Sequence, residues 1–170
     1  MYKLTKNNQS VIRKEDGACI PLALGNTDYS AYLEWVAEGG VPEPAQSGEE
    51  IFAEALSQQE TALSTVKKDV REEGLLVDGV LFDTDTGARI AYIELMFKFM
   101  LNPAYTVADW KASDGAWVTM DKATFDKLIG AWEVKLTDIF TFVKAKEQEV
   151  KAQTTAEAIL AVDVTYTPLP

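Results

Sequence analysis

The chain has 170 residues, of which 47% are hydrophobic and 10% aromatic, so it can bury a core and is not a disordered segment. Its formal net charge of −11 opposes binding to nucleic-acid phosphates and to anionic membrane surfaces. It has no histidine and one cysteine, Cys19, which excludes Ser-His-Asp and Cys-His catalytic sets, the main zinc ligand and an internal disulfide. We interpret Cys19 as a half-buried apolar residue, and we expect no membrane insertion, since no apolar run reaches about 18 residues.

Residues 1–40 are predicted to form a small module of strands and one helix. Asn26 or Thr27 can cap the free N–H groups of that helix, and a Gly-Gly pair ends it. Residues 41–48 contain two prolines and have the composition of a linker. The two strand-like runs before the helix cover residues 2–4 and 10–13.

Residues 49–74 are predicted to form an amphipathic connecting helix, and Gly74 is its C-terminal stop. Apolar side chains recur at alternating steps of three and four, which is the heptad spacing of a coiled coil. Two interpretations remain open: the helix packs on its own domain, or it self-associates as a parallel bundle. The candidate oligomer or partner interface consists of Phe52, Leu56, Leu63, Val66 and Val70.

Residues 75–163 are predicted to form an α+β domain, followed by a tail over 164–170. The domain begins with a hairpin that turns at Asp78-Gly79, because glycine tolerates the positive φ of a tight turn. A helix over 88–101 is apolar on nearly all sides, and its composition predicts that it is buried.

A second hairpin and a long helix, within residues 110–150, organise the rest of this domain. The hairpin turns at Asp114-Gly115, and Thr119 or Asp121 can cap the helix that follows. Its apolar residues are expected to form one broad stripe that packs on a sheet or another helix; they are Phe125, Leu128, Ile129, Trp132, Leu136, Ile139, Phe140, Phe142, Val143 and Val150. A short capped helix over 156–161 ends the domain. The predicted fold class is therefore α+β.

The sequence predicts no catalytic, cofactor-binding or metal site. Asp83, Asp85 and Glu94 match three positions of a calcium-binding loop, but Ala88 stands where that loop requires glycine. We interpret the aspartates as part of a turn that caps the next helix, and Glu94 as a hydrogen-bonded or edge residue rather than a working acid.

The four tryptophans are expected to pack in the core or an interface rather than to stack on sugars. Two of them flank the second hairpin, where they can pair across the strands. They are Trp35, Trp110, Trp117 and Trp132.

Two stretches resemble proteins of tailed bacteriophages. Residues 16–45 carry a DGA-x-IP turn, then N-x-DY-x-x-YL-x-W and a Gly/Pro exit, which resembles the N-terminal module of tail-fibre and tail-fibre-assembly proteins. Residues 79–163, with VLFDTD, the TVADWK…DGAWVTM hairpin and TTAEAILAVD, resemble an uncharacterised domain of phage tail proteins.

The resemblance implies a non-enzymatic structural protein of the phage tail that links or holds the tail fibre. Its expected partners are the fibre or other tail proteins and further copies of itself, with a trimer among the options. Its expected place is the tail of the virion, and the host cytoplasm during assembly. Two alternatives stay open: an assembly chaperone for the fibre that is absent from the virion, and a module that binds host glycans.

Overall fold

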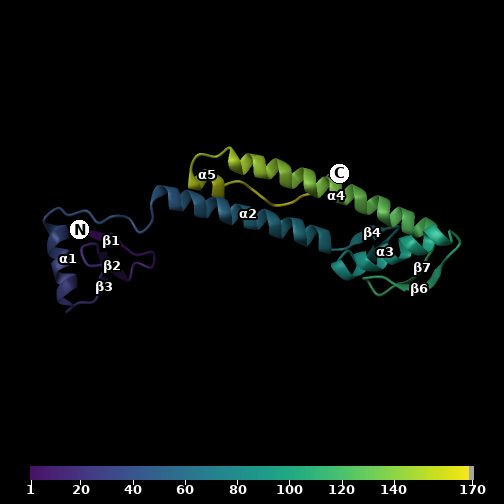
Figure 1. Cartoon of the computed structure of the whole chain (residues 1–170). Coiled ribbons are helices and arrows are strands. Elements are labelled where there is room, and N and C mark those ends of the chain that lie inside the picture. Colours follow the sequence, from purple (N-terminus) through teal and green to yellow (C-terminus); the bar gives the residue numbers. More distant parts are fainter. Residues whose placement is uncertain (169–170) are drawn as a thin grey trace. The chain divides into compact units, whose positions relative to one another are not determined.

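The computed structural model describes residues 1–168 and has an α+β fold, as predicted. The chain divides into two compact units, one over Met1–Glu54 and one that begins at Ala55. The boundary falls within the long helix α2 (Gly48–Glu72), and Figure 1 labels most elements of both units. Among the described residues, no helix is both long and apolar enough to cross a membrane.

The first unit is a three-stranded antiparallel sheet with one helix. The sheet has the order β1-β2-β3, with β1 at Tyr2–Leu4, β2 at Ser10–Arg13 and β3 at Cys19–Pro21. The predicted strands match β1 and β2, whereas β3 was not predicted, because proline and two neighbouring turns conceal a run of three residues. Pro21 is tolerated because β3 is an edge strand.

Helix α1 (Thr27–Ala37) is capped by Asn26, whose side chain accepts the backbone N–H groups of Asp28 and Tyr29. One of the two predicted caps is thereby confirmed. The core of this unit is aromatic: the Tyr2 ring lies 5.1 Å from the Tyr32 ring and 5.1 Å from the Trp35 ring.

The segment with the composition of a linker is attached to the first sheet. The Leu4 N–H donates to the Glu43 carbonyl at 2.9 Å, and the Glu43 N–H donates to the Tyr2 carbonyl at 2.8 Å. Lys14 also forms an ion pair with the Glu43 carboxylate. Backbone pairing, which composition does not reveal, therefore anchors the middle of residues 41–48.

The second unit is built on two antiparallel helices, α2 from Ala55 onward and α4 (Lys122–Lys151).

Ser47 and Glu50 form a reciprocal capping box at the start of α2, with Glu50 N–H to Ser47 Oγ at 3.1 Å and Ser47 N–H to Glu50 Oε2 at 2.7 Å. Of the two caps considered for α4, the structure uses Asp121, which accepts the Thr124 N–H at 2.8 Å.

A cluster of short strands and α3 (Thr86–Leu101) surrounds the first turns of α4. Strands β4 (Leu75–Val77) and β5 (Val80–Phe82) form the first predicted hairpin, and β6 (Val107–Lys111) and β7 (Trp117–Met120) form the second. The core between these elements consists of Val77, Phe82, Tyr92, Leu95, Phe99, Met120, Phe125 and Leu128.

The apolar stripe of α4 packs against two sets of partners along its length. Phe125 and Leu128 face the hairpins and α3, whereas Ile139 and Val143 pack with Val70 of α2. Phe140, which was expected to widen the stripe, is 49% exposed. The buried residues of α4 nevertheless keep the three-and-four spacing of one stripe, as predicted, and the two ends of this stripe have different partners.

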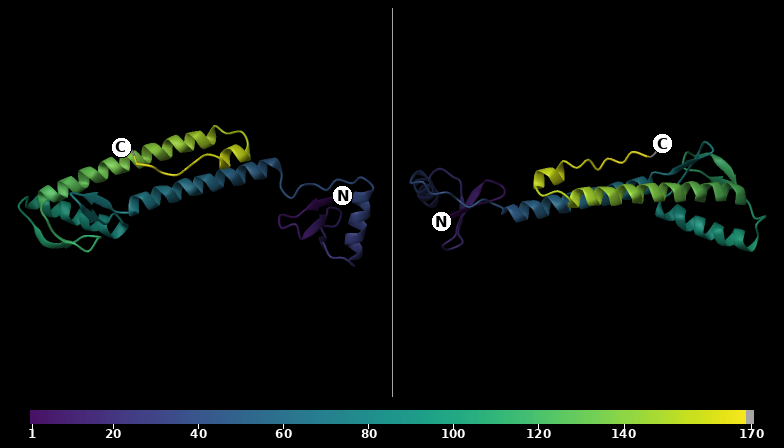
Figure 2. Two further views of the ribbon diagram at one scale, coloured as in Figure 1. Left: turned by 180° about the vertical axis from the view of Figure 1, so that it is seen from behind. Right: turned by 90° about the horizontal axis from the view of Figure 1, so that it is seen from above.

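The prediction that α3 is buried was wrong. One side of the helix enters the core through Tyr92, Leu95 and Phe99. The opposite side is exposed, and Figure 2 shows α3 on the flank of the α2–α4 pair rather than between those helices. The short strands and the start of α4 cover one face only, so an apolar composition on all sides did not lead to burial on all sides.

The C-terminal segment returns along the helix pair after α5 (Ala156–Leu160), which Thr155 caps. The buried Gln59 of α2 donates from its side-chain Nε2 to the backbone carbonyls of Ile159 at 3.0 Å, Leu160 at 3.3 Å and Val162 at 3.3 Å. One polar side chain of α2 thus attaches residues that lie about a hundred positions later in the sequence.

Candidate functional site

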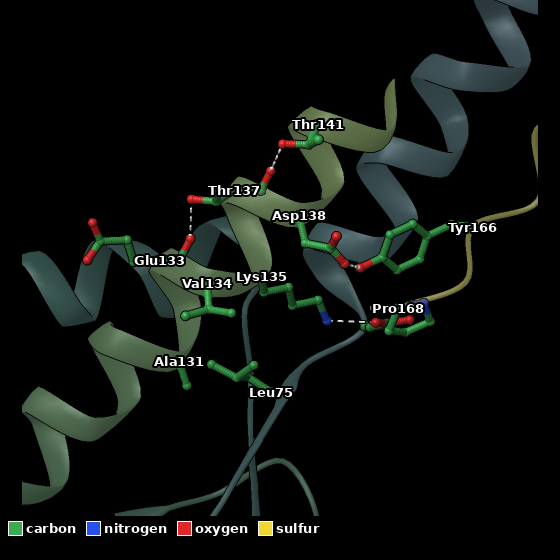
Figure 3. Close-up of a pocket in the computed structure, with 11 residues that line it drawn as sticks. Leu75, Ala131, Glu133, Val134, Lys135, Thr137, Asp138, Thr141, Tyr166 and Pro168 are labelled. Carbon is green, nitrogen blue, oxygen red and sulfur yellow. Dashed lines mark hydrogen bonds and ion pairs between the residues drawn. The ribbon is translucent and has the colours of Figure 1, made fainter. Parts of the chain in front are cut away.

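A recess of about 680 Å³ lies between α4 and the C-terminal segment (Figure 3). Leu75 from β4 and Ala131 and Val134 from α4 give it an apolar wall. Polar groups come from the end of α2, from α4 and from the tail. They are Glu73, Glu133, Lys135, Thr137, Asp138, Thr141 and Tyr166, and Pro168 completes the lining.

Lys135 holds the end of α2 beside this recess. Its Nζ lies 2.6 Å from Glu73 Oε1 and donates to the Gly74 carbonyl at 2.8 Å, and its side chain is 13% exposed. A cation at the C-terminus of a helix offsets the helix dipole and satisfies a free carbonyl. Gly74 has a φ of 92°, the left-handed conformation that commonly ends a helix and that glycine adopts without strain. Lys135 therefore stabilises the C-terminus of α2.

Tyr166 closes the other side of the recess. Its hydroxyl donates to Asp138 Oδ2 at 2.5 Å, and its ring packs edge-on against Phe142 at 5.4 Å between centroids. Burial, together with the hydrogen bond to Asp138, raises the pKa of Tyr166 to about 12. The phenol is thus protonated at neutral pH and serves as a hydrogen-bond donor.

The threonine hydroxyls of the recess bond to their own helix. Thr137 donates to the Glu133 carbonyl at 2.9 Å, and Thr141 donates to the Thr137 carbonyl at 2.8 Å (Figure 3). With the Lys135 and Tyr166 bonds, these contacts leave the apolar wall as the part of the recess that is best able to receive another group.

The calcium-like turn acts as a helix cap, as interpreted from the sequence. Asp85 Oδ1 accepts the Ala88 N–H at 2.7 Å at the start of α3. Glu94 is exposed on α3, next to the exposed apolar side chains of that helix. Within residues 1–168, no three His, Cys, Asp or Glu side chains converge in a way that could hold a metal ion.

The structure gives the predicted interface helix contacts within one chain. Leu63 and Val70 are buried, and Val66 packs on the cluster that Val70 forms with Ile139 and Val143 of α4. Phe52 and Leu56 are half-buried. This arrangement corresponds to the interpretation in which the helix packs on its own domain, and the sites at Leu63 and Val70 are not open to a second copy.

The tryptophans are not uniformly packed inside. Trp110 stacks on Tyr92 at 5.8 Å, but the hairpin register pairs Lys111 with Trp117, so the two tryptophans are not cross-strand partners. Trp117 is 65% exposed and has the Lys111 ammonium 5.8 Å from its ring centroid. Cys19 is also exposed, with its Sγ 3.3 Å from Ser10 Oγ, so the expectation of half-burial was wrong.

Comparison with known proteins identifies one family. The family model described as a domain of unknown function, DUF4376, matches residues 57–166. That range covers most of the second unit, including α3 and both hairpins. It also contains every residue that lines the recess except Pro168. No curated protein and no solved structure matches the chain.

Proposed function

The chain belongs to the DUF4376 family, whose function is unknown, and we propose that this member is a non-enzymatic structural protein of a bacteriophage tail. In this proposal it links or holds the tail fibre through protein–protein contacts and is present as a homo-oligomer. It is made in the host cytoplasm and incorporated into the tail of the virion.

The apolar surface of α3 is the observation that supports a binding role most strongly. Six large apolar side chains of this one helix are between 42% and 87% exposed, and large exposed patches of this kind mark surfaces that other proteins cover. They are Ile90, Ile93, Met96, Phe97, Met100 and Leu101. The phage tail as the location rests on the resemblance of residues 16–45 and 79–163 to phage tail proteins.

Mass spectrometry of purified particles of the phage that encodes the chain tests this location. A fixed copy number in each particle, retained after high-salt washing, is the expected result. Detection in infected-cell lysate but not in particles would overturn the virion role and favour the assembly chaperone.

One observation keeps glycan binding as a second candidate. Trp117 is exposed beside Lys111, which is a suitable platform for stacking against a sugar ring. Titration of the protein with host-cell glycans would quench tryptophan fluorescence in this case, and Trp117→Ala would abolish the quenching. Under the structural proposal the same titration leaves the fluorescence unchanged.

A further inference from the structure

The exposed side of α3 carries a heptad pattern of its own. Ile90, Ile93, Phe97 and Met100 follow one another at steps of three, four and three, so they lie along one line of the helix. This line lies opposite the side chains that enter the core. We call these four residues, with the flanking Met96 and Leu101, the α3 stripe.

The exposed area of the α3 stripe approaches the area that one partner contributes to a dimer interface. If a side chain of this size offers about 150–200 Å² when fully exposed, the stripe leaves roughly 500–700 Å² uncovered. The largest apolar patch of a typical monomer is about 300–600 Å², and each partner in a standard interface buries about 800 Å². A recess of about 280 Å³ between α3 and α4, lined in part by Ile93 and Met96, extends the same apolar surface.

The charges beside the stripe are compatible with a second copy of the chain. The whole chain has a formal charge of −11, whereas the charged residues of α3 are Arg89, Glu94 and Lys98, which sum to +1. The repulsion expected between two acidic molecules is thus weakest at this face. Because the charge of α3 is close to zero, this face does not require a partner protein of opposite charge.

The positions of Arg89 and Glu94 favour a parallel arrangement. They flank the stripe as the g and e positions of successive heptads, which are five residues apart and approach each other across a parallel, in-register helix pair. Within residues 1–168 of one chain, Arg89 Nη2 donates to Thr86 Oγ1 at 2.9 Å, and Arg89 Nη1 is buried without a hydrogen-bond partner. Among the same residues, Glu94 is in no ion pair. An antiparallel pair that joins Ile90 to Met100 would instead bring the two copies of Glu94 toward each other.

We infer that the α3 stripe binds the α3 stripe of a second copy of this chain, with the two helices parallel and in register and Arg89 of each copy paired with Glu94 of the other. This inference rests on the homo-oligomer part of the proposed function and names its surface. It places self-association on α3 rather than on the seam of α2, which is occupied within one chain.

Sedimentation of the full-length chain over a range of concentrations tests the surface. The wild-type protein is expected to associate at micromolar concentration, and Phe97→Asp is expected to be monomeric. Phe140→Asp is the matched control, since Phe97 is 56% exposed and Phe140 is 49% exposed on a different helix. A monomeric wild-type protein, or equal effects of the two substitutions, would overturn the inference. Because the particles are analysed separately, absence from the virion would refute the tail location and leave this result standing.

Charge reversal tests the pairing between copies. Arg89→Glu and Glu94→Arg each create a like-charge pair, and each is expected to weaken self-association on the order of tenfold. A mixture of the two variants restores opposite charges at both sites and is expected to form mixed oligomers with the wild-type affinity. A mixture that associates no better than either variant alone would refute the parallel pairing.

Cross-linking tests the orientation directly. In a Cys19→Ser background, Ile90→Cys is expected to form a disulfide between copies under mild oxidation, because a parallel pair places residue 90 beside its equivalent. Cross-linking between Ile90→Cys and Met100→Cys chains, without cross-linking of Ile90→Cys to itself, would show an antiparallel pair and contradict the inferred arrangement. Circular dichroism of every variant verifies that its fold is intact.

Discussion

Replacing Gln59 with leucine should loosen the C-terminal segment from α2. The Gln59 amide has two N–H bonds and faces three backbone carbonyls, so it satisfies at most two of them with well-aligned hydrogen bonds. The Ile159 carbonyl also accepts the Val162 N–H at 3.2 Å and would be left partly satisfied. A buried carbonyl that loses its donor costs about 1–3 kcal/mol, and leucine regains part of that by apolar burial. We expect Gln59→Leu to lower the free energy of unfolding by about 2 kcal/mol.

The adjacent Gln58 provides the control, since it occupies the same helix with its side chain exposed. Glutamine and leucine have similar helix propensities, so Gln58→Leu should change the unfolding free energy by less than about 0.5 kcal/mol. Urea denaturation followed by circular dichroism compares the variants, and hydrogen exchange locates the change. Faster exchange should appear in residues 156–166. Equal unfolding free energies for Gln58→Leu and Gln59→Leu would refute the claim that these hydrogen bonds hold the segment.

Ile139 is fully buried, so Ile139→Ala should cost about 2–5 kcal/mol in urea denaturation, whereas Val134→Ala, at a side chain 70% exposed on the same helix, should cost less than about 0.5 kcal/mol. A hydrogen bond from a first-turn N–H lowers the pKa of Asp121 below 3.8. The ionised cap therefore stabilises the fold above that pH, and this stabilisation is lost as the pH falls through the lower folded-state pKa. Denaturation between pH 2 and 5 should show a smaller fall in the free energy of unfolding for Asp121→Asn, because asparagine caps the helix without titrating. Tyr166 has a pKa raised to about 12, so its contribution to stability is complete below the usual pKa of 10.0 and is lost as the pH rises through 12. In an alkaline titration followed by tyrosinate absorbance, Tyr166→Phe should remove an ionisation step near pH 12. An unchanged titration would contradict the bond to Asp138.

The elements that depend on neighbouring residues were predictable from the sequence. Asp78 and Gly79 have φ values of 50° and 82°, as their hairpin requires, and Asn26 and Asp121 cap the helices that follow them. These features need no information from distant parts of the chain. The α+β class followed from them, because hairpins and long amphipathic helices alternate along the second unit.

Contacts between distant segments were not predictable in the same way. Gln59 occupies a seam position of α2, and the pattern gives no indication that its partner is a set of carbonyls around α5. The recess beside Lys135 is assembled from the end of α2, the middle of α4 and the tail, so no local motif marks it. The exposure of α3 was missed for the complementary reason, since composition records apolar side chains and not the number of elements available to cover them.

The return of the C-terminal segment to α2 has a consequence for synthesis in the cell. Gln59 leaves the ribosome about a hundred residues before the carbonyls that it binds, so this part of the second unit can close only after α5 and Val162 have been synthesised. A ribosome that stops before α5 would release a chain whose Gln59 is exposed together with the neighbouring apolar surface of α2. Such a fragment would be a good substrate for proteases, so chains that extend beyond α5 would accumulate in preference to shorter ones.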